Sequence, residues 1–285
     1  MSHPPSDKPV ETPSAEPAKE VSYSEILYEV KAGVAQITLN RPDRRNPIGA
    51  STVGELLHAL ERAKLDTAVK VVVLTGAGKV FSAGGDLSQM GGGGNPLQAG
   101  PSENRRAGTF VDLNLMLTGQ GIGKPTIAKV NGHAMAGGLG LLVACDVAIA
   151  ADDAQFATPE INVGLWPMMI MSTIFRNVPR KRAMELILTG DRIDAATAEK
   201  IGLITRAVPR DRLDAEVQAL CDKICQKSPL VMRLGLDAFH KMQDMDLEPA
   251  LRLLESELIN VLGTEDAGEG LMAFLQKRAP VWKGR

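Results

Sequence analysis

Four glycines stand close together in the segment NGHAMAGGLGLLVACDVAIA, residues 131–150: Gly132, Gly137, Gly138 and Gly140. A glycine inside a helix costs about 1 kcal/mol relative to alanine, so this cluster indicates that another group comes close to the backbone. Tight packing between a helix and a strand is the alternative explanation.

Glu160 in TPEINVG is a carboxylate with apolar neighbours. Its neighbours Ile161, Val163 and Leu165 are apolar, and a carboxyl group among apolar side chains has a raised pKa through desolvation. A group that takes up and returns protons near neutral pH needs such a pKa. The alternative is a peripheral carboxylate in a salt bridge, because most carboxylates are solvated.

The composition is that of an ordinary globular protein. The 285 residues, 44% of them hydrophobic, carry a formal charge of −2, so one large core and a smaller satellite domain are possible. Only 4% of the residues are aromatic and there is no basic stripe, so we expect no nucleic-acid partner. The longest apolar stretch, residues 139–151, contains Asp146 and is too short to span a bilayer, so we expect no membrane association.

Cysteine usage and the N-terminal segment bear on the compartment. Cys145, Cys221 and Cys225 have no disulfide-like spacing, which indicates a cytoplasmic protein, and their packing explains them better than a metal site does. Residues 1–20 contain five prolines and almost no large apolar side chain, so we predict a disordered tail without a targeting function.

Alternating strand and helix patterns run from residue 26 to residue 208. Apolar runs at 33–40, 69–78 and 125–132 predict strands, and the residues 51–64 predict a helix with one apolar face, formed by Val53, Leu56, Leu57 and Leu60. After Pro209 only helices are expected, at about 210–226, 229–244, 248–262 and 265–277. We predict an α/β fold of stacked strand-and-helix units at 21–208 and a helical region at 209–285, although periodicity alone leaves a doubly wound sheet open.

No cofactor site is expected. The segment VVVLTGAGK at 71–79 resembles a dinucleotide-binding turn, but Phe81 stands where the third glycine of that fingerprint is required. A phosphate-binding loop is also excluded, because Val80 rather than serine or threonine follows Lys79. The glycine-rich segment at 89–103 is expected to be a mobile flap.

Four segments together resemble the enoyl-CoA hydratase/isomerase, or crotonase, superfamily. They are GKVFSAGGDL at 78–87, NGHAMAGGLGLLVACDVAIA at 131–150, AQFATPEINVGLWP at 154–167 and ILTGDRIDAATAEKIGLI at 187–204. The resemblance covers about residues 25–280. It implies a spiral of repeated ββα units and a C-terminal helical region that forms a homotrimer or a hexamer. It also implies an acyl-CoA thioester as substrate, so that coenzyme A enters only as part of the substrate, and it implies no metal ion.

The resemblance also implies roles for particular residues. The backbone N–H groups of Ala83 and Gly137 would stabilise the negative charge of an enolate on the thioester oxygen, and Glu160 would be the catalytic acid/base. Substrate contacts are expected from the rest of both glycine motifs and from residues near both ends of the chain: Arg44, Arg45, Ser82, Gly84, Gly85, Asp86, Gly138, Gly140, Phe274 and Lys277. For Asp86 the resemblance implies a structural role at the turn beside the pocket, and capping of a helix is an equal alternative. The alternative for Arg44 and Arg45 is solvation at the surface, and the alternative for Phe274 is burial in the core.

One expected carboxylate is missing. The family's hydratases use two glutamates, and the second would stand at Gly140. A single carboxylate still permits hydration of a 2-enoyl-CoA or isomerisation of a 3-enoyl-CoA, the latter being favoured. Two alternatives remain: a hydratase–lyase of the feruloyl-CoA type, and a protein that binds acyl-CoA without turnover.

Overall fold

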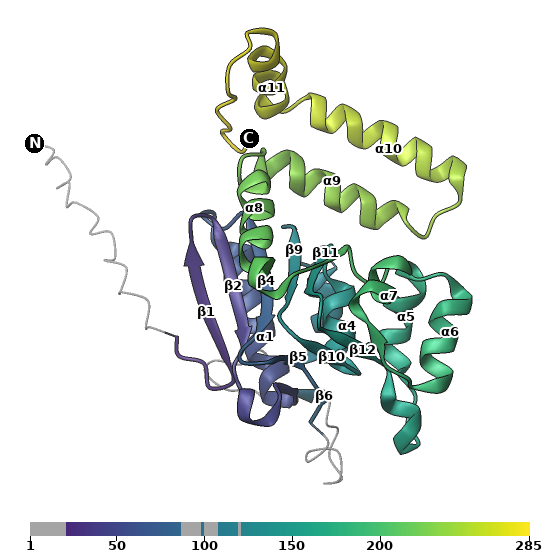
Figure 1. Cartoon of the computed structure of the whole chain (residues 1–285). Helices are drawn as coiled ribbons and strands as arrows, with labels where there is room; N and C mark the ends of the chain where they lie inside the picture. Colours follow the sequence, from purple (N-terminus) through teal and green to yellow (C-terminus); the bar gives the residue numbers. More distant parts are fainter. Residues whose placement is uncertain (1–20, 87–97, 100–107, 119–120) are drawn as a thin grey trace, which may run out of the picture.

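The computed structural model describes residues 21–86, 98–99, 108–118 and 121–285 (Figure 1). The predicted N-terminal tail and nearly all of the predicted glycine-rich flap lie outside these residues. None of the described helices has the length and apolar composition that a membrane span requires.

Two sheets are built from the same succession of chain units. The larger has six strands in the order β1-β2-β4-β9-β11-β14, parallel except for the antiparallel pair β1 and β2. These strands are Ile26–Lys31, Val34–Leu39, Val71–Gly76, Thr126–Val130, Val147–Ala151 and Arg206–Val208. The smaller sheet has the order β13-β12-β10-β5, with strands Ile193–Asp194, Gln155–Ala157, His133–Met135 and Val80–Ser82.

Each successive unit adds one strand to each sheet. The chain passes from β4 to β5, from β9 to β10, and from β11 to β12, and these strands keep the same relative order in both sheets. The prediction of stacked units rather than one flat sheet is therefore confirmed. Two short pairs lie outside these sheets: β3 (Pro47–Ile48) with β6 (Gly84–Gly85), and β7 (Gln98–Ala99) with β8 (Gly108–Thr109).

Helices cover the sheets and complete the core. The helix predicted at 51–64 is α1, Ala50–Leu65, and each of its four predicted apolar residues is at most 2% exposed. Before β14 the described residues also form α3 (Phe110–Leu117), α4 (Gly137–Ala144), α5 (Met168–Asn177), α6 (Arg180–Thr189) and α7 (Ala195–Lys200). Short 3₁₀ helices span Pro42–Arg44, Pro159–Val163 and Arg210–Arg212.

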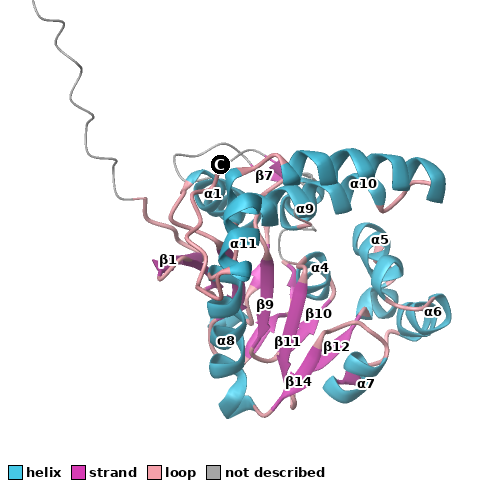
Figure 2. Cartoon of the chain, turned by 90° about the horizontal axis from the view of Figure 1, so that it is seen from above, coloured by secondary structure: helices cyan, strands magenta, loops and turns pink. Residues whose placement is uncertain are grey.

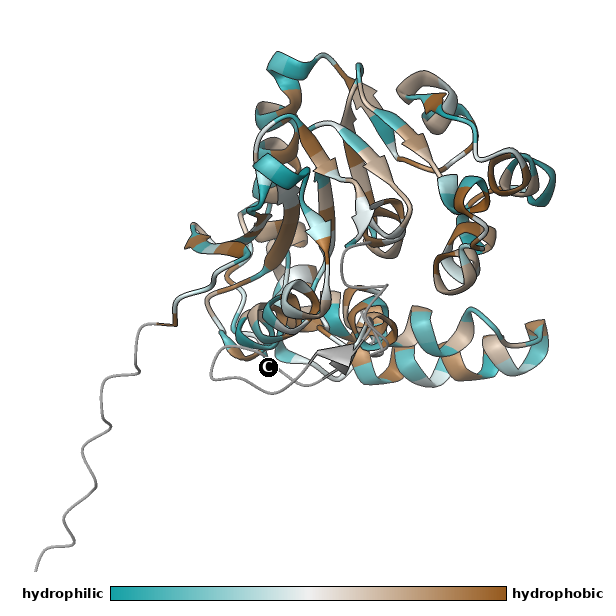
Figure 3. Ribbon diagram, turned by 90° about the horizontal axis from the view of Figure 1, so that it is seen from below, coloured by the Kyte–Doolittle hydropathy of each residue, from teal (hydrophilic) through white to brown (hydrophobic). Residues whose placement is uncertain are grey.

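The four helices predicted after Pro209 are confirmed as α8 (Leu213–Cys225), α9 (Pro229–Met242), α10 (Leu247–Leu262) and α11 (Glu265–Leu275). The first of them belongs to the core, because Leu213, Val217 and Cys221 of α8 are buried against the large sheet. Helices α9 and α10 pack against each other and extend away from the sheets (Figure 2). Apolar residues lie along the projecting helix α10 in Figure 3, and several remain exposed.

Candidate functional site

A cavity of about 510 Å³ lies between the turn at β6, the start of α4, the 3₁₀ helix at 159–163 and α5. Its wall is mostly apolar, with side chains that include those of Ile48, Val53, Phe110, Trp166, Met169 and Ile170. Of the described residues that line it, Asp86 and Glu160 are the two with ionisable side chains. A concave apolar site with a few polar groups is the usual form of a ligand pocket.

The glycines of the motifs at 78–87 and 131–150 allow the turn before α4 to pack against the segment that contains β5 and β6. A side chain at Gly84, whose φ is +94°, would place Cβ 2.6 Å from Cβ of Ala136, and Cβ at Gly138 would lie 2.6 Å from Cβ of Ser82. Ala136 itself has φ 49° and ψ −127°, an unfavourable conformation for alanine. Both explanations of the glycine cluster therefore apply: Gly84 and Gly138 permit packing, and Gly137 lines the cavity.

Two backbone N–H groups meet at one end of the cavity. Gly137 is the first residue of α4, and its N–H precedes the first hydrogen bond of that helix, from Gly140 N to Ala136 O (3.1 Å). A Cβ on Gly137 would lie 3.8 Å from the amide nitrogen of Gly85, which also lines the cavity. The two amides are therefore neighbours at the positive end of the α4 dipole.

The prediction that Ala83 supplies the second N–H group is wrong for this structure. The N–H of Ala83 donates to the carbonyl oxygen of Arg45 at 2.9 Å and is not available to a ligand. Asp86 N–H donates to Ile48 O (3.0 Å), and successive N–H groups of a strand point to opposite sides, so the N–H of Gly85 points away from β3. Gly85, expected only as a substrate contact, is the better donor.

Glu160 lies in the 3₁₀ helix at 159–163, directly after the buried Thr158, whose hydroxyl donates to Leu186 O (3.0 Å). Its carboxylate oxygen Oε2 is buried and has no hydrogen-bond partner. Desolvation raises the pKa of Glu160, and a backbone hydrogen bond opposes this shift only in part. A peripheral salt-bridging role is therefore contradicted, and the upward direction of the pKa shift is the one that a proton carrier near neutral pH requires.

Asp86 is buried and paired with cations. Its carboxylate lies 3.5 Å from Nη1 of Arg41 and 3.3 Å from Nη2 of Arg44, and Arg41 also pairs with Glu25 at 3.1 Å. The alternative of plain solvation for Arg44 is therefore wrong, while contact of Arg44 with coenzyme A stays a prediction. Arg45 is exposed, with its backbone in the left-handed region and its carbonyl bound to Ala83. The helix that Asp86 was expected to cap lies outside the described residues.

The remaining predicted contacts divide into packing residues and distant residues. Ser82 is fully buried: its hydroxyl donates to Asn46 O (2.8 Å) and accepts from Gly84 N–H (3.1 Å). Ser82, Gly84, Gly138 and Gly140 are not among the described residues that line the cavity. In this chain they pack around the site, and their contact with a substrate stays a prediction.

Phe274 and Lys277 at the C-terminus lie outside the cavity formed by this chain. Phe274 is 80% exposed, so the alternative of burial in the core is wrong. Contact of Phe274 or Lys277 with a ligand therefore stays a prediction.

Gly140 faces an isoleucine rather than open space. A Cβ at this position would lie 2.2 Å from Cγ2 and 3.0 Å from Cβ of Ile170, and 3.5 Å from Cζ of Phe110. Ile170 is 3% exposed. The place where a second carboxylate was sought is therefore already filled by a side chain of α5.

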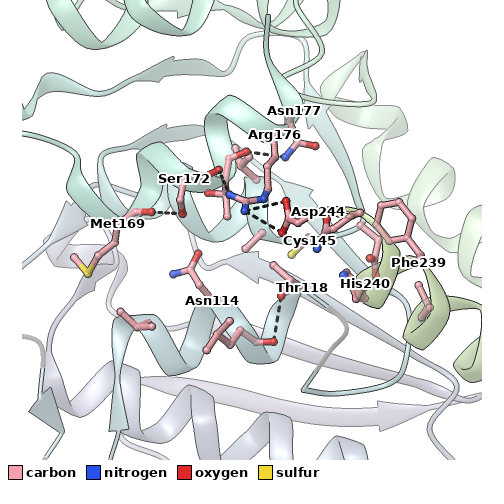
Figure 4. Close-up of a pocket in the computed structure, with 18 of the residues that line it drawn as sticks. Asn114, Thr118, Cys145, Met169, Ser172, Arg176, Asn177, Phe239, His240 and Asp244 are labelled. Atoms are coloured by element: carbon pink, nitrogen blue, oxygen red, sulfur yellow. Dashed lines mark hydrogen bonds and ion pairs between the residues drawn. The ribbon is translucent and has the colours of Figure 1, made fainter. Parts of the chain in front are cut away.

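A second cavity of about 700 Å³ adjoins the first and shares Met168 and Met169 with it. It lies between α3, the C-terminal end of α4, α5 and α9, and Figure 4 shows Asn114, His240 and the Arg176–Asp244 pair around it. Arg176 Nη2 lies 3.2 Å from both carboxylate oxygens of Asp244. Met168 and Met169 line both cavities and so lie between them.

Three ionisable side chains at this second cavity have shifted pKa values. Desolvation raises the pKa of the Cys145 thiol, which disfavours the thiolate that a cysteine nucleophile needs. Burial also raises the pKa of Asp146, whose Oδ2 accepts from the Thr126 N–H (2.7 Å) and hydroxyl (2.9 Å). Burial lowers the pKa of His240. Among the described residues no group of three or more His, Cys, Asp or Glu side chains is arranged to hold a metal ion.

Two residues that shape the site are missing from the sequence-based predictions. The buried side-chain amide of Asn46 donates to the carbonyl oxygens of Ala77 (3.0 Å) and Val80 (2.8 Å) and so holds the turn between β4 and β5, which precedes Gly85 in the chain. Ile170 fills the space beside Gly140. Neither has a local signal, because both act on residues far away in the sequence.

Comparison with known proteins gives a consistent result over most of the chain. Residues 29–285 match the family model described as enoyl-CoA hydratase/isomerase. A 2,3-dehydroadipyl-CoA hydratase of Escherichia coli is 35% identical over 266 residues, which are 92% of this chain and 100% of the relative. The mitochondrial enoyl-CoA hydratase domain-containing protein 3 of Xenopus laevis is 35% identical, over 90% of this chain and 85% of its own length.

Solved structures agree with the sequence relatives. The crystal structure of an enoyl-CoA hydratase from Bacillus anthracis superposes with a TM-score of 0.84 at 30% identity, covering 92% of this chain and 100% of the other. The human enoyl-CoA hydratase domain-containing protein 3 has a TM-score of 0.82 at 32% identity, with coverages of 91% and 100%. The spiral of ββα units followed by a helical region is therefore the crotonase fold.

Proposed function

Because the chain belongs to the enoyl-CoA hydratase/isomerase family, we propose that it is an enzyme that acts on enoyl-CoA thioesters through an enolate. Within this family we assign it one proton-carrying carboxylate, Glu160, and a preference for isomerisation of a 3-enoyl-CoA over hydration of a 2-enoyl-CoA. The argument rests on the cavity that brings Gly85, Gly137 and Glu160 together.

The thioester oxygen accepts hydrogen bonds from the N–H groups of Gly85 and Gly137. Negative charge develops on this oxygen when a proton leaves C2, and the positive end of the α4 dipole favours it there. Removal of one such donor typically lowers kcat about 10²–10³-fold, which gives the scale of their contribution. Both amides are held by the fold, so little reorganisation is needed during the reaction.

Glu160 carries the proton. Its carboxylate takes the proton from C2, and the electron pair of the broken C–H bond forms the enolate. The C3=C4 double bond then shifts to C2=C3 as the same proton is returned to C4, so that no other reactant is consumed. The raised pKa of Glu160 supports both halves of this transfer, since the group must be a base first and an acid afterwards.

The preference for isomerisation over hydration is inferred from one observation: among the described residues that line the cavity, no second carboxylate is unpaired. Asp86 is the other carboxylate there, and it is paired with Arg41 and Arg44. Water addition across C2=C3 needs one group to take a proton from water and one to protonate C2, which is harder for a single carboxylate.

The test compares both reactions on the same enzyme preparation. Binding of a non-reactive acyl-CoA is measured by isothermal titration calorimetry, and the products of a 3-enoyl-CoA and of crotonyl-CoA are then measured side by side. We expect thioester binding and faster isomerisation. Absence of binding would refute the thioester assignment, whereas hydration faster than isomerisation would refute only the preference.

We also propose that the second cavity receives the distal part of a longer acyl chain. The two cavities are neighbours because both are lined by Met168 and Met169. Val143 lines the second cavity and not the first. A larger side chain at this position should narrow the second cavity only. For Val143→Phe we therefore expect kcat/KM for a ten-carbon enoyl-CoA, divided by kcat/KM for crotonyl-CoA, to fall about tenfold, which is the effect of losing an apolar contact. An unchanged ratio would show that the chain leaves the first cavity elsewhere.

Finally, we propose a homotrimer or a hexamer assembled through the C-terminal helices of a cytoplasmic protein. Exposed apolar side chains on α10 and α11 support this assembly: Leu251, Leu258, Ile259, Leu262, Leu271, Phe274 and Leu275. Apolar area of this extent is rare on monomers. It would also bring Phe274 and Lys277 close to the site of a neighbouring subunit.

A further inference from the structure

Gly140 and Ile170 fit each other across the contact between α4 and α5. Gly140 stands three residues after Gly137 and so lies on the same face of α4 as the amide that lines the cavity. Ile170 lines that cavity as well, and its Cγ2 occupies the point 2.2 Å from where a side chain at position 140 would begin. The space beside Gly137 thus belongs to Ile170.

Ile170 has little freedom to move aside. Its Cβ would lie 3.0 Å from a Cβ at position 140, so the conflict involves the branched part of the side chain and not a flexible end. A β-branched residue in a helix is restricted at χ1, and Ile170 is buried within the core. Phe110 closes another side, 3.5 Å from the same point.

We propose that Ile170 is the specificity-determining residue that limits this active site to chemistry with one carboxylate. It excludes both a carboxylate side chain at position 140 and the water that such a group would hold close to Glu160. The proposal rests on the proposed enolate chemistry, and it extends that chemistry by naming the side chain that selects between proton return and water addition.

The two reactions differ in their need for this space. In isomerisation one proton leaves C2 for Glu160 and is returned to C4. In hydration the oxygen of water bonds to C3, one of its protons is taken up by a base, and a second acidic group delivers a proton to C2. Only hydration requires room for water and a second proton carrier beside the thioester.

The test exchanges the sizes of the two residues. We compare Gly140→Glu, Ile170→Gly, the double variant Gly140→Glu/Ile170→Gly, and the matched double variant Gly140→Gln/Ile170→Gly, which has the same shape without a carboxylate. Urea unfolding, binding of a non-reactive acyl-CoA, crotonyl-CoA hydration and 3-enoyl-CoA isomerisation are measured for each.

We expect Gly140→Glu alone to lower the urea midpoint without faster hydration. The double variant should recover part of that midpoint and should raise the ratio of hydration to isomerisation about 10²-fold over the wild type, the lower end of what a positioned acid/base contributes. The matched glutamine variant should show the recovered midpoint but not the change in ratio.

Three results would overturn the proposal. The first is a urea midpoint of Gly140→Glu alone that equals that of the wild type, and the second is hydration by Gly140→Glu alone that is as fast as by the double variant. The third is a double variant that binds acyl-CoA and still hydrates crotonyl-CoA no faster than its glutamine control. If the double variant does not fold, the milder pair Gly140→Glu/Ile170→Ala is compared with Gly140→Gln/Ile170→Ala: the glutamate variant must show the higher ratio of hydration to isomerisation, and equal ratios overturn the proposal. Failure of the proposed function is separate, since the wild type would then neither bind nor isomerise a thioester.

Discussion

Replacement of Glu160 by glutamine separates the proton carrier from the shape of the site. Glutamine keeps the size of the side chain but has no exchangeable carboxyl proton. We expect kcat for isomerisation to fall about 10²–10⁴-fold, which corresponds to about 3–5 kcal/mol of lost transition-state stabilisation. Binding of a non-reactive acyl-CoA should persist, because Gly85 and Gly137 still hold the thioester.

The same substitution should change stability in a pH-dependent way. Burial raises the pKa of Glu160 above its ordinary value of 4.5, so the folded chain binds more protons than the unfolded chain between these two pKa values. The free energy of unfolding of the wild type therefore falls as the pH rises through this window, and it stays lowered at neutral pH. Glutamine carries no charge to desolvate. We expect Glu160→Gln to unfold at a higher urea concentration than the wild type at pH 7, with a difference that shrinks as the pH falls from the raised pKa toward 4.5 and is lost below it.

The assay combines steady-state kinetics with urea unfolding at several pH values, and Glu160→Asp serves as the control that keeps a carboxylate. The activity of the wild type should decline as the pH falls through the raised pKa of Glu160, since the first step needs the base. A loss of activity below tenfold in Glu160→Gln, or a variant that is less stable than the wild type at pH 7, would refute the reasoning that Glu160 is a desolvated proton carrier.

Two further predictions concern the surroundings of the site. Arg41→Gln should lower the free energy of unfolding by about 1–3 kcal/mol, because the buried Asp86 carboxylate loses a partner. Urea unfolding should show a smaller loss for Asp86→Asn, and equal losses would contradict this asymmetry. Phe274→Asp should weaken the assembly, because the exposed apolar surface of α11 gains a charge. Sedimentation velocity should show smaller species than the wild type, and an unchanged distribution would exclude α11 from the interface.

Local patterns were sufficient for most of the secondary structure. The four apolar residues of α1 repeat at helical spacing, and the C-terminal helices begin close to the predicted positions, at Leu213, Pro229, Leu247 and Glu265. Hydrophobic periodicity reports which face of an element is buried, and this information lies within the element itself. The predicted boundary at residue 209 does not fully separate the core from the C-terminal helices. Helix α8 packs on the large sheet, although its sequence resembles that of the helices after it.

The choice of the hydrogen-bond donor shows where local patterns end. Ala83, Gly84 and Gly85 are neighbours in one motif, and their sequence does not say which N–H is free. The answer depends on β3, whose pairing with β6 directs the N–H of Asp86 to Ile48, while Arg45 accepts from Ala83. Direction of a backbone N–H is a property of the strand pair and not of the motif.

The sequence by itself determined the kinds of group available: a glycine-rich helix start, a carboxylate among apolar residues at Glu160, and the absence of a carboxylate at Gly140. The tertiary structure alone decided how these groups meet. Packing of α5 on α4 fills the space beside Gly140 with Ile170, and burial leaves Glu160 Oε2 without a partner. The physical reason is that desolvation and steric exclusion depend on atoms brought together from distant segments, which no spacing along the chain records.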